Sequence, residues 1–360
     1  MAERVTIQDI ADALGLSRNT VSKAINNTGV LADATREKIL LKAVEMGYKQ
    51  FSYIKPEDFR TSLSAEPKTA VSPEGGGIIA VLTTCQLGNS HFSSTMLDKV
   101  HRELSQAGYS LTMYRISPED LKACRLPSAF PPEKTDGIMC IEVFDFAYGT
   151  FLTSLGIPLL FIDGPVPIPG KKLATDMLVM NNRSEIYTFV AKMKERGKKT
   201  FGYIGHTMHC ISFQERFLAL QEALRFCELP FNEKYCITGV DPDIDIGSGS
   251  PYQDYLSKEL DKMPELPDVF LCANDFVAYD LLQACRKKGL QVPRDFYLCG
   301  FDDSAESRVT TPTLTTIHIH SQIMGFSAAQ LLLTRIKYPY LHYRTVYTET
   351  SLICRESTES

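Results

Sequence analysis

Hydrophobic residues near the N-terminus recur at the spacing of a short amphipathic helix. Four of them share one helical face: Ile7, Ile10, Ala11 and Leu14. Thr6 and Asp9, three residues apart, can cap the first amides, and Gly15 tolerates the left-handed backbone with which helices often end. The pattern predicts a helix that begins after Thr6 and ends at Gly15.

A second helix follows at once, with Ser17 as its cap and Val21, Ala24 and Ile25 on its buried face. The opposite face carries side chains that can donate to base edges or contact phosphate: Arg18, Asn19, Ser22, Lys23 and Asn26. Two short helices joined by so tight a turn predict a helix-turn-helix with a DNA-reading face. The same spacing also fits an ordinary helical hairpin with a solvated polar face.

A third helix is predicted from about Asp33 or Thr35 to Met46, with Gly47 after it as a stop. Its buried side is again apolar: Ile39, Leu40, Ala43 and Val44. Three helices of this length can close a small core of their own, which favours the helix-turn-helix over the plain hairpin.

The segment VTIQDIADALGLSRNTVSKAIN, followed by TREKIL and MGY, closely resembles the DNA-binding headpiece of the lactose-repressor (LacI-type) family. That resemblance implies that Arg18, Asn19 and Lys23 read bases in the major groove. It also implies that a second set of side chains holds phosphates: Thr6, Ser17, Thr20, Ser22 and Asn26.

The length of 360 residues exceeds one ordinary domain, so we expect a small headpiece joined to a larger body. The formal net charge of -5 argues against a protein coated with nucleic acid. DNA contact would therefore come from a local basic face, and the N-terminal region supplies one: Arg18, Lys23, Arg36, Lys38, Lys42 and Lys49.

The sequence carries no charged leader before an apolar segment and no apolar run long enough to cross a bilayer, so we expect a cytoplasmic protein without a membrane partner. Its 10 cysteines are scattered without a CxxC pair. Several of them, such as Cys140, Cys272 and Cys299, lie in apolar runs where a reduced thiol acts as a small hydrophobic group.

Hydrophobic periodicity disappears between Gln50 and Gly77, where Ser, Pro, Glu and Gly dominate, which predicts a linker. LacI-type proteins usually carry here a hinge helix whose leucine wedges into the minor groove. Ile54, Phe59 and Leu63 offer apolar wedges, but none lies at the family's distance from the headpiece and the usual alanine is absent. The sequence leaves open whether this linker inserts into DNA.

From Ile78 onward, short apolar runs alternate with helical segments. The runs are IIAVL, GIMCI, PLLFI, TFGYIG, DVFLCA and FYLCGF, and the helices between them include 94–107, 185–196, 215–227 and 276–288. Continuous apolar strands indicate parallel sheets covered on both faces. The predicted fold is an all-α headpiece plus an α/β body of two doubly wound parallel-sheet lobes.

Ligand sites in parallel sheets lie beyond the carboxyl ends of the strands. The polar residues that follow the predicted strands are Gln86 to Phe92, Asp163, His206, Asn274, Asp275, Asp302 and Asp303. Carboxylates, an amide and an aromatic face suit a small polyhydroxylated molecule, because each carboxylate can accept from two hydroxyls. Asp302 and Asp303 also fit a simpler role as caps of a following turn.

The body also resembles the regulatory core of LacI-type repressors, in PDVFLCANDFVAYDLLQACRKKGLQVPRDFYLCGFDDS, TPTLTTI and LICREST. That core is similar to a periplasmic sugar-binding protein. The resemblance implies these effector contacts: Asn89, Phe92, Asp163, Arg216, Asn274 and Asp302. The chain departs from the family at NSHF and at the pair Asn181 and Asn182, which leaves the effector class open.

No nucleophile elbow, P-loop or dinucleotide glycine pattern occurs, so we expect neither an enzyme nor a cofactor. The sequence brings together two histidine groups that suggest metal binding: His206, His209 and Cys210, and His318 with His320. Both lack further ligands at matched spacing, so we assign no metal site to them.

These observations predict a headpiece over residues 1–49, a linker over 50–77 and a bilobed core over 78–360. The leading hypothesis is a transcriptional repressor that binds a near-palindromic operator as a homodimer and is controlled allosterically by a sugar-like effector. A ligand-sensing protein with a vestigial headpiece, which signals through a protein partner, is the alternative. A metabolic enzyme that carries a headpiece is a third reading.

Overall fold

The computed structural model describes residues 5–25, 33–46, 48, 77–84, 91–239 and 249–359. Contacts along the chain divide it into two compact units, Met1–Val71 and Ser72–Ser360. Apart from Gly77, the predicted linker lies outside the described residues, and so do Ile54, Phe59 and Leu63. The domain boundaries predicted above therefore remain predictions.

The smaller unit is a three-helix headpiece. Its helices are α1 (Ile7–Leu14), α2 (Arg18–Ile25) and α3 (Asp33–Glu45). The predicted caps form, because Thr6 N donates to Asp9 Oδ2 (2.7 Å), Asp9 N donates to Thr6 Oγ1 (3.3 Å) and Gly15 ends α1 with φ 64°. The apolar faces close one core: Ile10, Ala11, Val21, Ala24, Ile39, Ala43 and Tyr48. The predicted helix-turn-helix is confirmed as a fold.

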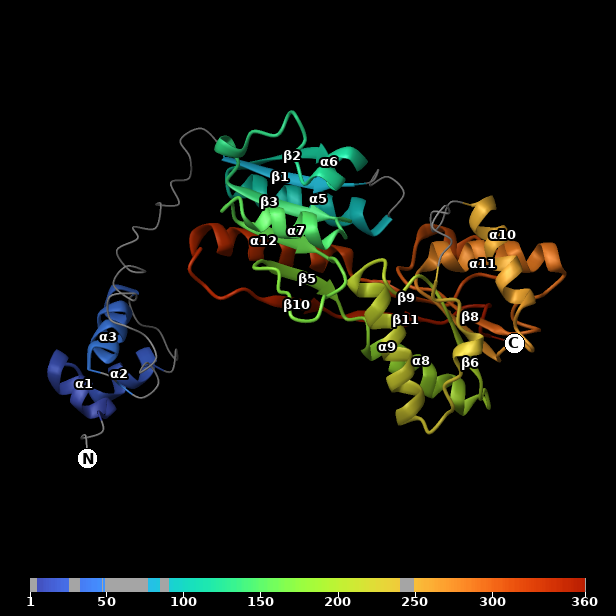
Figure 1. The fold of residues 1–360 in the computed structure, drawn as a ribbon. Helices are drawn as coiled ribbons and strands as arrows, with labels where there is room; N and C mark the ends of the chain where they lie inside the picture. The colour runs from blue at the N-terminus through green and yellow to red at the C-terminus, as the bar shows by residue number, and fades with distance from the viewer. Residues whose placement is uncertain are drawn as a thin grey trace. The chain divides into compact units, whose positions relative to one another are not determined.

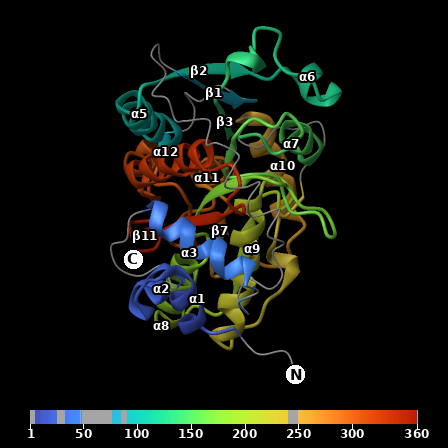
Figure 2. The same cartoon turned by 90° about the vertical axis from the view of Figure 1, so that its left-hand side faces the viewer.

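The first lobe of the larger unit is built on a parallel sheet with strand order β10-β5-β4-β3-β1-β2 (Figure 1). The strands are β1 (Gly77–Thr83), β2 (Tyr109–Arg115), β3 (Gly137–Ile141), β4 (Leu159–Ile162), β5 (Asp176–Met180) and β10 (Thr345–Thr348). The helices of this lobe are α5 (His91–Gln106), α6 (Pro118–Ala123), η2 (Pro132–Lys134), α7 (Phe146–Thr153) and α12 (Ser321–Lys337). Figure 2 shows α5 and α12 on one side of the sheet and α7 on the other.

Both faces of this sheet are apolar because alternate residues of each strand point to opposite sides. In β1, Ile79 and Val81 pack in a core that includes Met324 of α12. Ala80 and Leu82, the residues between and after them, pack in a second core under α7. A strand buried on both faces is apolar at nearly every position, which is why this strand could be predicted from the sequence.

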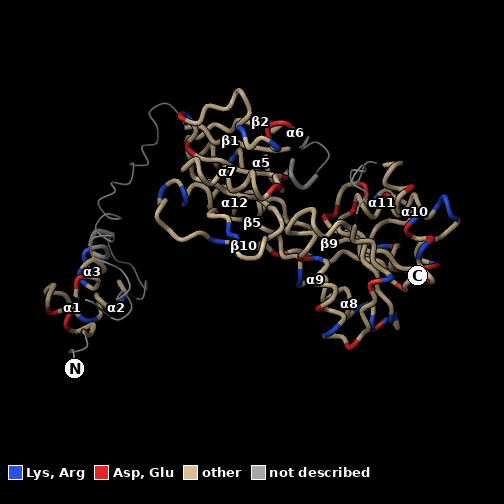
Figure 3. Tube along the Cα trace, in the orientation of Figure 1, with Lys and Arg blue, Asp and Glu red and all other residues tan. Residues whose placement is uncertain are grey.

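The second lobe carries the parallel sheet β6-β7-β8. Its strands are β6 (Phe201–Ile204), β7 (Val269–Cys272) and β8 (Tyr297–Cys299), with β9 (Thr316–Ile319) and β11 (Thr350–Ile353) as an antiparallel pair. Its helices are α8 (Ser184–Glu195), α9 (Ile211–Phe226), η3 (Glu233–Tyr235), α10 (Ser250–Asp261), α11 (Asp275–Lys288) and η4 (Ala305–Arg308). Charges of both signs alternate over this lobe (Figure 3), and two ion pairs, Lys287–Asp254 and Lys288–Asp261, join α10 to α11.

The chain crosses between the two lobes after β5, after β9 and between β10 and β11. The crossing residues include Asn182 and His320, which precede α8 and α12 respectively. Segments far apart in sequence therefore meet between the lobes, and we call these crossings the hinge.

The predicted apolar runs all form strands, and the predicted helices correspond to α5, α8, α9 and α11. The strands β2, β5, β9, β10 and β11 were not predicted, because most of them are exposed at edges or mix polar with apolar residues. Helix α9 begins at Ile211, four residues before the predicted start at Glu215. Among the described residues, no helix has the length and apolar character needed to cross a membrane.

Candidate DNA-binding face and effector site

Helix α2 presents its predicted reading face away from the headpiece core. Arg18, Asn19 and Lys23 are exposed, whereas Val21 and Ala24 on the opposite face are buried. Within the described part of the headpiece, neither Arg18 nor Lys23 forms an ion pair, so both cations are available to base edges or phosphates. This geometry fits major-groove reading by a recognition helix.

The predicted phosphate contacts have local roles as well. Ser17 Oγ accepts from Thr20 N (3.1 Å) and so caps α2, while Thr6 Oγ1 donates to Asp9 Oδ2 (2.7 Å). The hydrogen bond from Thr6 lowers the pKa of Asp9, which keeps that carboxylate charged at the start of α1. Asn26 and Lys49 lie outside the described residues. Helix capping therefore accounts for these hydroxyls whether or not they also contact phosphate.

Three of the predicted effector residues converge at the carboxyl ends of the strands. Asp163 follows β4 in the first lobe, Arg216 lies on α9 and Asp302 follows β8 in the second lobe. Arg216 Nη1 lies 3.7 Å from Asp302 Oδ1, and the Arg216 guanidinium stacks over the Phe301 ring at 3.5 Å. Only 2% of Arg216 is exposed, so its charge lies in a low-dielectric site, where its electrostatic interaction with a polar ligand would be strong.

Asp163 links the two lobes. It adopts φ 58°, and its Oδ1 accepts from Gly164 N (2.9 Å) and from Ser212 N (3.3 Å) in the first turn of α9. Burial raises the pKa of this carboxyl, and Arg216 opposes that shift. A non-glycine residue held at positive φ is uncommon, and such strain is concentrated at functional sites.

The backbone of Asp302 also adopts a positive φ, of 113°. Burial raises the pKa of its carboxyl to about 8; Arg216 lowers it, while Asp275, Glu142 and Asp163 raise it further. A carboxyl that is largely protonated at neutral pH can donate as well as accept a hydrogen bond. This dual capacity matches a hydroxyl or amide partner.

The remaining predicted effector residues have other outcomes. Asn274 precedes α11 and its Oδ1 accepts from Val277 N (3.0 Å), so this side chain caps the helix. Asn89 lies outside the described residues, and Phe92 lies in α5 but its side chain is not described. The assignment of all six effector contacts stays a prediction.

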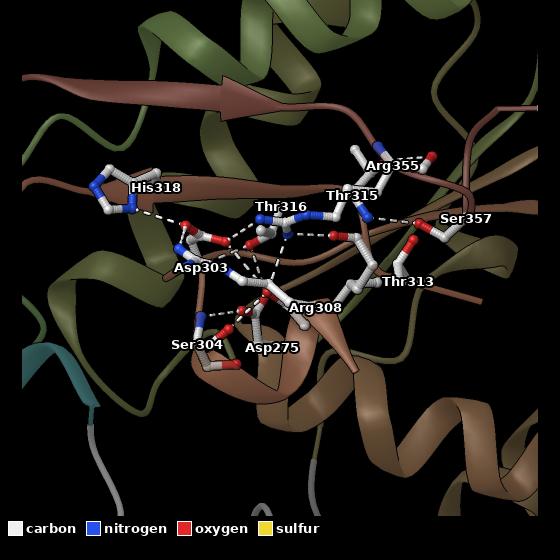
Figure 4. A network of polar contacts seen from close by, with 12 residues as sticks. Asp275, Asp303, Ser304, Arg308, Thr313, Thr315, Thr316, His318, Arg355 and Ser357 are labelled. Atoms are coloured by element: carbon white, nitrogen blue, oxygen red, sulfur yellow. Dashed lines mark hydrogen bonds and ion pairs between the residues drawn. The ribbon is translucent and has the colours of Figure 1, made fainter. Parts of the chain in front are cut away.

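Asp303, next to Asp302, has a structural role (Figure 4). Its two oxygens accept from Arg355 (2.5 Å), Arg308 (2.8 Å) and His318 Nδ1 (3.0 Å), which tie the C-terminal segment and β9 to the loop after β8. Asp303 is thus held by residues distant in sequence, and the following turn η4 has Ser304 at its N-cap with no side-chain capping bond, so the predicted capping role does not describe Asp303. Asp302 faces Arg216.

Three of the four histidines in these groups have partners within the protein. His320 Nε2 pairs with Ser351 Oγ (2.9 Å), while His318 pairs with Asp303. His209 packs between Phe144 (4.9 Å between ring centroids) and Phe213 (5.1 Å), and burial lowers its pKa to about 4. Among the described residues, no cluster of three or more His, Cys, Asp or Glu side chains is placed to hold a metal ion.

A cavity of about 380 Å³ opens beside Asp302. It is lined from both lobes and the hinge by residues that include Thr95, Arg308, His318, His320 and Ser321. This volume is in the range of small-molecule sites. Asp302 lines the cavity, whereas Asp163, Arg216 and Asn274 do not. Sequence reasoning missed Phe301 and Ser212, since an apolar residue beside the acids and a serine at a helix start carry no distinctive signal. It singled out Asn182 as a departure from the family but gave that residue no role.

Two family models match the chain. Residues 6–50 match "Bacterial regulatory proteins, lacI family", and residues 190–358 match "Periplasmic binding protein-like domain". The HTH-type transcriptional repressor PurR of Mannheimia succiniciproducens is 25% identical over 358 residues, which is 98% of each chain. The same repressor from Actinobacillus pleuropneumoniae serotype 3 is 28% identical and covers 99% of this chain and 98% of its own.

Solved structures agree on the fold. The complex of the transcriptional regulator CelR with cellobiose has a TM-score of 0.66 at 21% identity and covers 98% of this chain and 100% of its own. The lac repressor dimer bound to operator and the anti-inducer ONPF has a TM-score of 0.63 at 19% identity, with 99% and 100% covered. With its headpiece, its bilobed body and these relatives, the chain belongs to the LacI family of bacterial DNA-binding transcription regulators.

Proposed function

We propose that the chain is a repressor that reads its operator with Arg18, Asn19 and Lys23 and releases or binds it in response to a small effector held between the lobes. The exposed reading face of α2 on a complete headpiece core carries this proposal. A vestigial headpiece is not expected to retain both an exposed reading face and a complete core, so the alternative of a ligand sensor without DNA binding is disfavoured.

The first test selects DNA sequences bound by the full chain and compares Arg18→Ala with the wild type. Loss of a bidentate base contact weakens binding by roughly 5- to 150-fold, equivalent to about 1–3 kcal/mol. Arg102→Ala is the control, because Arg102 is exposed on α5 and pairs with Asp98 far from the headpiece sequence. Binding that is equally weak on all sequences, or unchanged in Arg18→Ala, would contradict the proposal.

The effector we propose is a sugar or a sugar derivative that contacts Asp163, Arg216, Asn274 and Asp302. The pairing of a buried guanidinium with two carboxyls beside the Phe301 ring supports a polyhydroxylated ligand. A thermal-shift screen with sugars, sugar phosphates and nucleosides tests this, since a ligand that binds the folded state raises its melting temperature. If Arg216→Met leaves the shift of a hit intact, the site is wrong.

We further propose a cytoplasmic homodimer, because two headpieces match the two halves of a near-palindromic operator. The strand β2, which ends the sheet of the first lobe and leaves 51% of Met113 accessible, is an open sheet edge that a second copy can cover. Light scattering at micromolar concentration tests the state, and a monomer or a tetramer would refute it.

A further inference from the structure

The guanidinium of Arg216 is oriented by a buried amide at the hinge. Arg216 Nε donates to Asn182 Oδ1 (2.9 Å), and its Nη1 donates to the Ala273 carbonyl (2.5 Å). Asn182 is only 1% exposed and stands where the chain leaves β5 for α8. A residue of the hinge itself therefore holds the cation of the proposed effector site.

The orientation of the Asn182 amide is fixed by its other partners. Its Nδ2 donates to Glu215 Oε2 (2.9 Å) and to Ser212 Oγ (3.2 Å), which uses both amide hydrogens. Only Oδ1 is then left to face Arg216, because a flipped amide would set a donor against a donor. Glu215, itself 9% exposed, thus determines which atom of Asn182 meets the guanidinium.

This network also reaches the first lobe, through Ser212, whose amide donates to Asp163 Oδ1 (3.3 Å), and through the hydroxyl of Tyr347. Tyr347 belongs to β10, the edge strand of the first lobe, and its hydroxyl donates to Glu215 Oε1 (3.1 Å) on α9 of the second lobe. The next residue along, Thr348, ends β10 and leads into the crossing to β11. Two of the hinge crossings are therefore joined by a chain of side chains, from Tyr347 through Glu215 to Asn182, that ends at Arg216.

We infer that Asn182 and Glu215 are positioning residues for Arg216, and that Tyr347 ties them to the first lobe so that the effector site depends on the arrangement of the lobes. The inference rests on the proposed effector site and deepens it. A change in the angle between the lobes would move the Tyr347 hydroxyl, free Glu215 and allow the Asn182 amide to turn. The coupling between ligand binding and lobe arrangement is reciprocal, because a ligand that fixes Arg216 must favour the lobe arrangement in which Arg216 is held.

The test follows the titration of Asp302, which reports the position of Arg216 without any effector. The groups that act on this carboxyl are Arg216, Asp275, Glu142 and Asp163. An opposite charge within about 4–6 Å lowers the pKa of a carboxyl by roughly 1–3 units, so release of Arg216 must raise it. Carbon-13 NMR of aspartate-labelled protein gives the midpoint, and the Asp302 signal is identified by its loss in Asp302→Asn.

We expect Asn182→Ala and Glu215→Gln to raise the Asp302 midpoint by about one pH unit. Glutamine keeps the volume of Glu215 but loses one of its two acceptor oxygens, so it carries the test if Asn182→Ala fails to fold. Tyr347→Phe is expected to move the midpoint in the same direction by a smaller amount. Tyr343→Phe is the matched control, since Tyr343 is similarly exposed (49% against 51%) and lies four residues away.

A midpoint unchanged in both Asn182→Ala and Glu215→Gln, in protein whose circular dichroism is that of the wild type, would overturn the positioning role. Equal midpoints in Tyr347→Phe and Tyr343→Phe would overturn the link to the first lobe. The measurement needs neither operator nor effector. Its failure therefore leaves the DNA-binding proposal standing, and a chain that binds no operator can still pass it.

Discussion

Replacement of Asp302 by asparagine should change how stability depends on pH. Burial raises the pKa of this carboxyl from its ordinary value of 3.8 to about 8, so the folded chain holds a proton that the unfolded chain has released. The free energy of unfolding must then fall as the pH rises through this interval, because the folded state binds more protons than the unfolded state. Asparagine resembles the protonated carboxyl in shape but does not titrate.

The size of the effect follows from the two pKa values. One proton is worth at most about 1.4 kcal/mol per pH unit, so a folded pKa near 8 removes about 2 kcal/mol of stability between pH 6 and pH 8. Asp275, whose pKa burial raises to about 7, acts in the same direction. Because Asp275 is present in both proteins, its contribution largely cancels when Asp302→Asn is compared with the wild type.

Urea unfolding at pH 6, 7 and 8 measures this difference. The chain has no tryptophan, so far-ultraviolet circular dichroism is the better probe of the transition. We expect the stability of Asp302→Asn relative to the wild type to increase by about 2 kcal/mol from pH 6 to pH 8. A difference that stays constant within about 0.5 kcal/mol across this range would refute the argument that burial keeps Asp302 protonated.

Three further substitutions test the fold. Asp176→Ala should lower the free energy of unfolding in urea by about 3–5 kcal/mol, because Arg335, 4% exposed, loses its buried carboxylate partner. Asp98→Ala removes only an exposed ion pair and should cost under about 1 kcal/mol. Equal costs would contradict this reasoning. Gly325→Ala places a Cβ 2.5 Å from a carbonyl oxygen of α5 and should lower the stability of the body by about 1–3 kcal/mol, so an unchanged melting temperature would count against the close packing of α5 and α12. Thr6→Ala removes the cap of α1 and should speed hydrogen exchange in that helix by roughly 5-fold, equivalent to about 1 kcal/mol, with no effect on the body.

The sequence by itself determined the headpiece. Its signals are contacts between residues three or four positions apart, such as the capping pair of Thr6 and Asp9 and the glycine at position 15. The parallel lobes were equally legible, because strands buried on both faces are apolar at every position, as β3 and β4 are. Local chemistry is enough wherever the partners of a residue are its neighbours in the chain.

Tertiary structure decided the roles of the polar residues. Asp302 and Asp303 are adjacent and chemically identical, yet one faces Arg216 while the other is held by Arg355, 52 residues away. Asn274, predicted to contact an effector, caps α11 in the structure. Nothing in the sequence around these residues distinguishes the three outcomes.

The hinge illustrates the physical reason. Glu215 and Tyr347 are separated by 132 residues and meet only because the chain returns to the first lobe after β9 and leaves it again after β10. Hydrophobic periodicity specifies which face of an element is buried, but a single hydrogen bond between distant elements leaves no periodic trace in the sequence. The elements of this protein were therefore encoded locally, whereas the partners of its buried polar groups were settled only when those elements packed together.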